Sequence, residues 1–209
     1  MVMLVPFTAH SNVKIEHGID DDYNGITCSK PSLQKARHFK SELKLFLKKY
    51  KQAVISRNLT KVVACKKLTR GHYNWYRGTY VISQNTIYVE IGGNIDDTEY
   101  LLHHEFSSLL LHAHPHKAQK MKIKWISWSN KNYNLDHNKR DWILKKSLQK
   151  NGFLYEYNKV SFENDFNVLS AFYMSFYLRH KLTRARQKHW RLQKKYEMLH
   201  KFYQPLIDI

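Results

Sequence analysis

One stretch, residues 98–112 (T-E-Y-L-L-H-H-E-F-S-S-L-L-L-H), constrains the fold more than any other. Its apolar residues recur at the three- and four-residue spacing of a helix that buries one face. The preceding D-D-T segment, residues 96–98, supplies side-chain oxygens that begin a helix, and Glu99 places a negative charge near the positive end of the helix dipole. Pro115 cannot continue a helix. The sequence therefore predicts a half-buried helix of about four turns.

The middle of this helix carries His103, His104 and Glu105. In the pattern H-E-x-x-H, two histidines one helical turn apart bind zinc, and the glutamate acts as general base on the zinc-bound water. His104 and Glu105 occupy the first two places, but the fifth place is Ser108, and a hydroxyl is a poor zinc ligand. His112 lies roughly 12 Å along the helix axis from His104, so it cannot simply replace the missing histidine. The pattern is incomplete, and two polar residues at the edge of the core are the simpler alternative.

The composition is that of a globular protein with a large excess of basic residues. The chain has 209 residues, enough for one domain with a sizeable core. Its 35 lysines and arginines against 17 acidic residues give a net charge of +18, which attracts nucleic acid, anionic membranes or acidic proteins. Because the basic residues are spread over most of the chain, a solubilising surface is the simpler interpretation.

The sequence gives no indication of the compartment. Cys28 and Cys65 are the two cysteines. One possible pair is not a disulfide framework, so we expect each to be a small buried thiol. The sequence contains no run of 18 apolar residues, so it predicts no transmembrane helix. Met1–Ala9 lacks the basic start of a signal peptide.

The remaining patterns predict an α+β fold whose sheet lies in the N-terminal half. Short strands are expected at Val13–His17 and Lys61–Leu68. Thr79–Ile82 and Thr86–Ile91 alternate around a short turn, as in a hairpin. A helix with an apolar stripe begins at Pro31 or Ser32.

The C-terminal half is expected to be mainly helical. Residues 117–150 predict an irregular loop and then a helix near Arg140–Gln149. Ser161 begins a helix that continues through Phe176 and Tyr177, and a last helix runs from about Thr183 to Tyr203. Without an internal repeat or a linker, residues 1–209 are predicted to form a single domain, with a β-rich half (1–97, including one long helix) and a mainly helical half (98–209).

Three sequence blocks, in this order, resemble a family of zinc-binding metallopeptidases of the zincin fold. They are T-I-Y-V-E-I at 86–91, L-L-H-H-E-F-S-S-L-L-L at 101–111, and G-F-L-Y-E-Y-N-K-V-S-F-E-N-D-F-N at 152–167. The resemblance implies a small antiparallel or mixed sheet whose edge strand, Thr86–Ile91, lies beside the metal helix. In that fold the edge strand takes an extended peptide by strand addition.

The resemblance also implies an acidic zinc ligand from the third block. In lethal-factor-like zincins this ligand is an acid just before a phenylalanine on the helix after the metal helix. Asp165, which precedes Phe166, matches that place best, and Glu163 is the second choice. A tyrosine a few residues upstream assists at the metal; Tyr157 is the nearest match, with Tyr155 behind it.

Carried over to this chain, the resemblance implies that zinc is bound by His104 and by Asp165 or Glu163. Glu105 would then be the general base, and Tyr157 would stabilise the developing oxyanion.

Three states of this site stay open because Ser108 departs from the family pattern. Metal is held by His104, an acid and another histidine such as His103; or it is held weakly with extra waters; or the fold serves only for binding.

The predicted function is accordingly a zinc-dependent metallopeptidase or metallopeptidase-like protein that acts on an extended peptide or protein, and enzymatic activity itself is left open. One alternative is a non-catalytic binding protein on the same fold. Another is a protein that binds nucleic acid or another polyanion through the basic, aromatic-rich segment 117–150.

Overall fold

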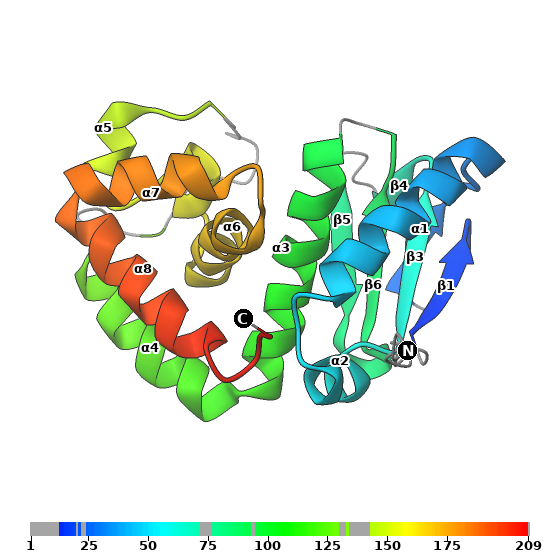
Figure 1. The fold of residues 1–209 in the computed structure, drawn as a ribbon, viewed down its shortest axis with the longest axis horizontal. Coiled ribbons are helices and arrows are strands. Elements are labelled where there is room, and N and C mark those ends of the chain that lie inside the picture. The colour runs from blue at the N-terminus through cyan, green and yellow to red at the C-terminus, as the bar shows by residue number, and fades with distance from the viewer. Residues whose placement is uncertain are drawn as a thin grey trace, which may run out of the picture.

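The computed structural model describes residues 13–19, 21, 24–71, 77–92, 95–129, 133 and 143–208. The fold is α+β, with a small mixed sheet in the N-terminal half and a helical C-terminal half, as the sequence predicts. Figure 1 shows the sheet with α1, α2 and α3 on one side of the molecule and α4 to α8 on the other.

A four-stranded sheet forms the centre of the N-terminal half, in the order β1-β3-β6-β5. The strands are β1 (Lys14–His17), β3 (Lys61–Cys65), β5 (Gly78–Val81) and β6 (Thr86–Glu90). β1, β3 and β6 are parallel, and β5 pairs antiparallel with β6. The predicted hairpin is therefore confirmed; its connection contains a short 3₁₀ helix, η2 (Ile82–Gln84), and Asn85 in the left-handed conformation.

The identity of the edge strand differs from the prediction. β6, the predicted edge strand, is paired on both sides, with β3 in parallel and with β5 antiparallel. The buried run in β3 pairs along the whole of β6, from Lys61 opposite Thr86 to Cys65 opposite Glu90. Such an apolar parallel pair is typical of strands covered on both faces. Among the described strands, β5 ends the sheet on this side and is the edge strand.

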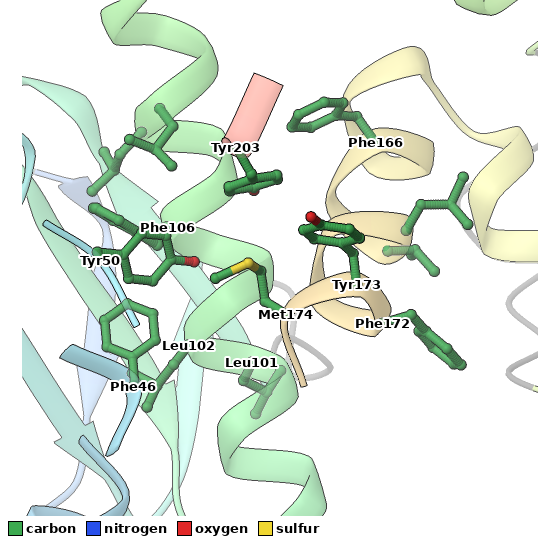
Figure 2. Close-up of a cluster of buried hydrophobic side chains, with 14 of the residues drawn as sticks. Phe46, Tyr50, Leu101, Leu102, Phe106, Phe166, Phe172, Tyr173, Met174 and Tyr203 are labelled. Carbon is green, nitrogen blue, oxygen red and sulfur yellow. The ribbon is translucent and has the colours of Figure 1, made fainter. Parts of the chain in front are cut away.

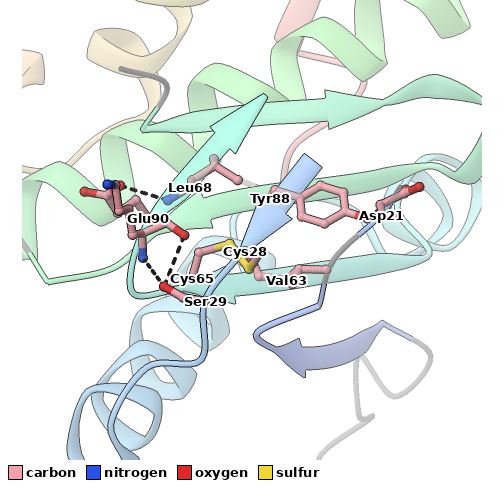
Figure 3. The surroundings of a disulfide bond; sticks show 9 residues. Asp21, Cys28, Ser29, Val63, Cys65, Leu68, Tyr88 and Glu90 are labelled. Atoms are coloured by element: carbon pink, nitrogen blue, oxygen red, sulfur yellow. Dashed lines mark hydrogen bonds between the residues drawn. A yellow bond between two sulfur atoms is a disulfide. The ribbon is translucent and has the colours of Figure 1, made fainter. Parts of the chain in front are cut away.

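A disulfide bond joins Cys28 to Cys65, which corrects the expectation of two free thiols (Figure 3). Cys28 ends β2 (Ile26–Cys28), which pairs antiparallel with β4 (Leu68–Arg70) in a second, two-stranded sheet. Cys65 ends β3, and the two Cα atoms are 5.1 Å apart, within bonding range. Both sulfur-bearing residues are buried, so the bond fastens the small sheet to the large one from inside.

Eight α-helices and a second 3₁₀ helix are present in the described residues. They are α1 (Leu33–Leu47), α2 (Gln52–Asn58), α3 (Ile95–Ala113), α4 (Pro115–Ser127), α5 (Lys146–Gln149), η3 (Glu156–Lys159), α6 (Phe162–Met174), α7 (Arg179–Lys188) and α8 (Trp190–Tyr203). The predicted starts of α1 and α6 are confirmed, because Ser32 and Ser161 cap these helices with their side chains. α3 is the helix predicted from residues 98–112, but it begins at Ile95, so the predicted capping segment 96–98 lies inside the helix.

Three helix boundaries differ from the predictions. Pro115 ends α3 but also opens α4, because proline at the first helical position needs no amide hydrogen bond; residues 117–127 are therefore helical. α6 ends at Met174, before Phe176 and Tyr177. The predicted last helix is two helices, α7 and α8, because the backbone at His189 is extended. The helix expected near 140–149 is a single turn, α5, because residues 143–145 are not helical; residues 140–142 lie outside the described residues.

α3 lies at the centre of the core, with aromatic side chains on both sides (Figure 2). Phe46 and Tyr50 pack against Phe106 on the side of the sheet. Tyr173 and the other aromatic residues of α6 lie on the opposite side, and one hydrophobic cluster contains residues of both halves. The direction in which an α3 side chain points therefore decides which half of the molecule it meets. No described helix is long and apolar enough to span a membrane.

Candidate functional site

The adjacent histidines of α3 face different surroundings, because neighbouring helical residues point about 100° apart. His103 is fully buried, and its Nδ1 lies 2.8 Å from the hydroxyl of Tyr50. Its ring packs against Phe46, and its Nε2 has no hydrogen-bond partner among the described residues. Burial holds the pKa of His103 well below its ordinary value, so the ring is neutral. His103 is therefore part of the core on the α1 side.

His104 meets the tyrosines of the helical half. Its Nδ1 lies 3.3 Å from the hydroxyl of Tyr100, and its ring stacks on Tyr157 with centroids 6.1 Å apart. The Tyr157 hydroxyl donates to Asn164 Oδ1 at 3.0 Å. Burial lowers the pKa of His104 to about 3, so the ring is neutral at pH 7. The structure thus brings together His104 and Tyr157, two of the predicted site residues.

Asp165, the first choice for an acidic ligand, lies in a separate buried network. Its Oδ2 accepts hydrogen bonds from Trp125 Nε1 at 2.7 Å, Tyr133 Oη at 2.6 Å and Lys195 Nζ at 2.6 Å. Its Oδ1 accepts from Asn158 Nδ2 at 2.7 Å. Both oxygens are occupied, and the buried ammonium of Lys195 would repel a metal ion. The structure gives no support to Asp165 as a ligand.

Glu163, the second choice, lies where β5, α3 and α6 meet. The Tyr80 hydroxyl of β5 donates to Glu163 Oε1 at 2.6 Å. His112 Nε2 is 4.0 Å from the same oxygen and 3.3 Å from the Tyr80 hydroxyl. Burial and then the charge of Glu163 raise the pKa of Tyr80, so the phenol stays protonated and keeps donating. Glu163 is held by the edge strand.

Ser108, at the place of the second zinc-binding histidine, is hydrogen-bonded to α6. Asn167 Nδ2 donates to Ser108 Oγ at 2.6 Å, and both residues are buried. Ser108 is also close enough to Tyr80 to lower the pKa of that phenol, in opposition to burial. We call the two hydrogen-bonded pairs, Asn167–Ser108 and Tyr80–Glu163, the Ser108 cluster. Hydrogen-bonded side chains from α3, α6 and β5 thus occupy the position of the missing ligand.

Glu105 lies against the backbone of the edge strand and is only 7% exposed. A Cβ atom on Gly78 of β5 would lie 2.6 Å from Glu105 Oε1, so glycine is what permits this close approach. Burial and then the charge of Glu163 raise the pKa of Glu105 to about 8, while Arg70 opposes the shift. At pH 7 the carboxyl is therefore mostly protonated, and it can donate a hydrogen bond.

The described residues do not fit a zinc ion at this site. Ligand atoms must all lie about 2 Å from the metal, hence within ~3–4 Å of one another. Among the histidine, cysteine, aspartate and glutamate side chains that the structure describes, no three are grouped to hold a metal ion. Asp165 is occupied by its own network, and Glu163 is bonded to Tyr80. The predicted zinc site stays a prediction.

Sequence reasoning missed Gly78, Tyr80 and Asn167. Asn167 was detectable in part, since Glu163 and Asn167 are four residues apart in the E-N-D-F-N block and share one face of α6. Tyr80 and Gly78 carry no such signal, because their role depends on β5 being the edge strand.

No family model matches the chain, and no curated protein or solved structure proved similar to it.

Proposed function

We propose that this protein is a metallopeptidase-like binding protein that holds an extended peptide along edge strand β5 without cleaving it. The zincin-like fold and the peptide are both part of the proposal. The observation that carries it is the Ser108 cluster, because Ser108, bonded to Asn167, stands at the place where a hydrolase of this kind needs its second metal ligand.

The state of Glu105 supports binding rather than hydrolysis. A general base must be ionised to take a proton from water, whereas burial and Glu163 keep Glu105 mostly protonated at neutral pH. A protonated carboxyl beside β5 instead offers a hydrogen bond to a peptide carbonyl. It does so without adding a charge to a buried site, where an unpaired charge is costly.

The geometry of β5 supports an extended ligand. An edge strand presents backbone donors and acceptors on its outer side, and an added strand satisfies them. β5 is short and lies directly beside α3, with Glu105 against Gly78 at its start and Tyr80 in its middle. Neutral His104, one turn of α3 before Ser108, stacks on Tyr157 and adds an aromatic pair near this site.

The test uses a pool of synthetic, unstructured, net-neutral decapeptides with one equivalent of zinc chloride. We expect the full chain to retain peptides intact, with slower hydrogen exchange at the β5 amides and no cleavage products by mass spectrometry. Glu105→Gln should retain them as well, because an amide also donates a hydrogen bond, whereas Glu105→Ala should lose them.

Two results would overturn the proposal. Zinc-dependent cleavage that Glu105→Gln abolishes would show a metallopeptidase, the leading function predicted from the sequence. Failure of the wild-type protein to retain any peptide would remove the binding function.

A further inference from the structure

The outward face of α7 is basic and lacks acidic partners. Residues 166–196 contain no aspartate or glutamate. Lys181, Arg184 and Lys188 are exposed, and their spacing of three and four residues places them in one stripe. Leu182 and Ala185 face inward. In the described part of the structure, none of the three cations forms an ion pair, so the stripe carries an uncompensated positive charge.

Two aromatic side chains extend this stripe at its N-terminal end. Phe176 is 81% exposed and Tyr177 is 48% exposed, and their rings contact each other with centroids 5.5 Å apart. The turn between α6 and α7 has helical hydrogen bonds, from the amide of Arg179 to the carbonyl of Ser175. Phe176 and Tyr177 lie in this turn, directly before α7. The sequence had predicted that both continue the helix that begins at Ser161.

The disulfide bond narrows the class of partner. Buried disulfides such as Cys28–Cys65 form and persist in oxidising compartments outside the cytosol, where nucleic acid is not the usual polyanion. Exposed aromatics beside lysines and arginines are the combination that binds the interfacial region of anionic lipid bilayers. Charge and apolar exposure on α7 thus fit a lipid surface better than a nucleic acid.

We propose that Phe176, Tyr177, Lys181, Arg184 and Lys188, the α7 face, dock this protein onto an anionic lipid surface. The aromatic pair enters the headgroup region, and the stripe neutralises lipid phosphates. This interaction is peripheral. No helix of the described residues is long and apolar enough to span a membrane. It does not depend on the proposed peptide site, which lies at β5.

The test is co-sedimentation of the full chain with vesicles of phosphatidylcholine alone or mixed with phosphatidylglycerol. We expect binding to the mixed vesicles, weakened by salt, and little binding to phosphatidylcholine. The triple variant Lys181→Glu/Arg184→Glu/Lys188→Glu should lose affinity on the order of 100-fold, since each basic residue near the surface contributes about tenfold or less. Phe176→Ser/Tyr177→Ser should weaken binding without changing its salt dependence.

The matched control is Lys120→Glu/Lys122→Glu/Lys124→Glu on the exposed side of α4, which changes the net charge equally. It should keep most of the binding, and circular dichroism should show all variants folded. An equal loss of vesicle affinity in both triple variants would show that net charge alone causes the binding, and it would overturn the proposal. So would absence of binding to the mixed vesicles, or tighter binding to single-stranded RNA at the same salt concentration.

Discussion

Two buried carboxyl groups, Asp165 of α6 and Glu105 of α3, have opposite surroundings. Asp165 is paired with a buried lysine, and three further side chains donate hydrogen bonds to it. Glu105 has no cation in contact among the described residues, and burial and then the nearby carboxylate of Glu163 raise its pKa to about 8. Burial of a charge is tolerated when it is paired and hydrogen-bonded, and is otherwise avoided by protonation.

The two carboxyl groups therefore have different roles: Asp165 stabilises the fold, and Glu105 is a candidate for ligand binding. The Asp165 network is closed and joins α4, α6, α8 and the segment before α6, so it holds the helical half together. Glu105 costs stability when ionised, because burial and the charge of Glu163 outweigh the attraction of Arg70. A residue kept in such surroundings beside an edge strand is a candidate for ligand binding.

The largest effect is expected from breaking the Asp165 network. Lys195→Met leaves a buried carboxylate without its cation and should lower the free energy of unfolding by about 3–5 kcal/mol. Urea denaturation measures this loss. The double variant Asp165→Asn/Lys195→Met should recover part of it, because no uncompensated charge remains. A cost below about 1 kcal/mol for Lys195→Met would show that the network is not what holds the helical half.

A smaller effect is expected where Glu105 meets the edge strand. In Gly78→Ala the new methyl group would overlap the Glu105 carboxyl and should cost about 1–3 kcal/mol, although alanine is otherwise better than glycine in a strand. In a Glu105→Ala background the same change should cost little, which thermal denaturation of the four proteins would show. Equal costs in both backgrounds would mean that the carboxyl does not lie against Gly78.

The most gradual effect is the pH dependence that Glu105 gives to stability. Because its folded pKa of about 8 lies above its ordinary value of 4.5, the folded protein binds one more proton than the unfolded chain between these pH values. Glu105 therefore destabilises the fold progressively as pH rises through this window. Relative to Glu105→Gln, the wild type should lose at most about 1.4 kcal/mol per pH unit there. If the urea midpoints of the wild type and Glu105→Gln change with pH in the same way, this prediction is contradicted.

The parts of the fold that local sequence determines were predictable. The apolar spacing of α3, the caps Ser32 and Ser161, and the β5–β6 hairpin each depend on residues close in the chain. The edge strand and the disulfide were not, because both depend on β3, which pairs with β6 and places Cys65 beside Cys28. Pairing between distant segments leaves no periodic signal in a single sequence.

For the same reason, only part of the candidate site was predictable. His104, Glu105, Ser108 and Glu163 were selected from patterns within single helices, and the structure places Ser108 and Glu163 beside the same side chain, Tyr80. Asp165 was selected by its position before Phe166. Its role depends on Lys195, thirty residues further along, and Trp125, forty residues earlier. Sequence position alone does not show which of two nearby acids receives a buried cation.

The protonation state of Glu105 tests the central claim most directly. Carbon-13 NMR of protein labelled at the glutamate carboxyl groups, with the Glu105 signal assigned by its absence in Glu105→Gln, gives the titration midpoint of this single group. A neutral, hydrogen-bond-donating Glu105 beside β5 predicts a midpoint of about 8. A midpoint near 4.5, the ordinary value, would mean that Glu105 is ionised at neutral pH and would contradict the binding site described above.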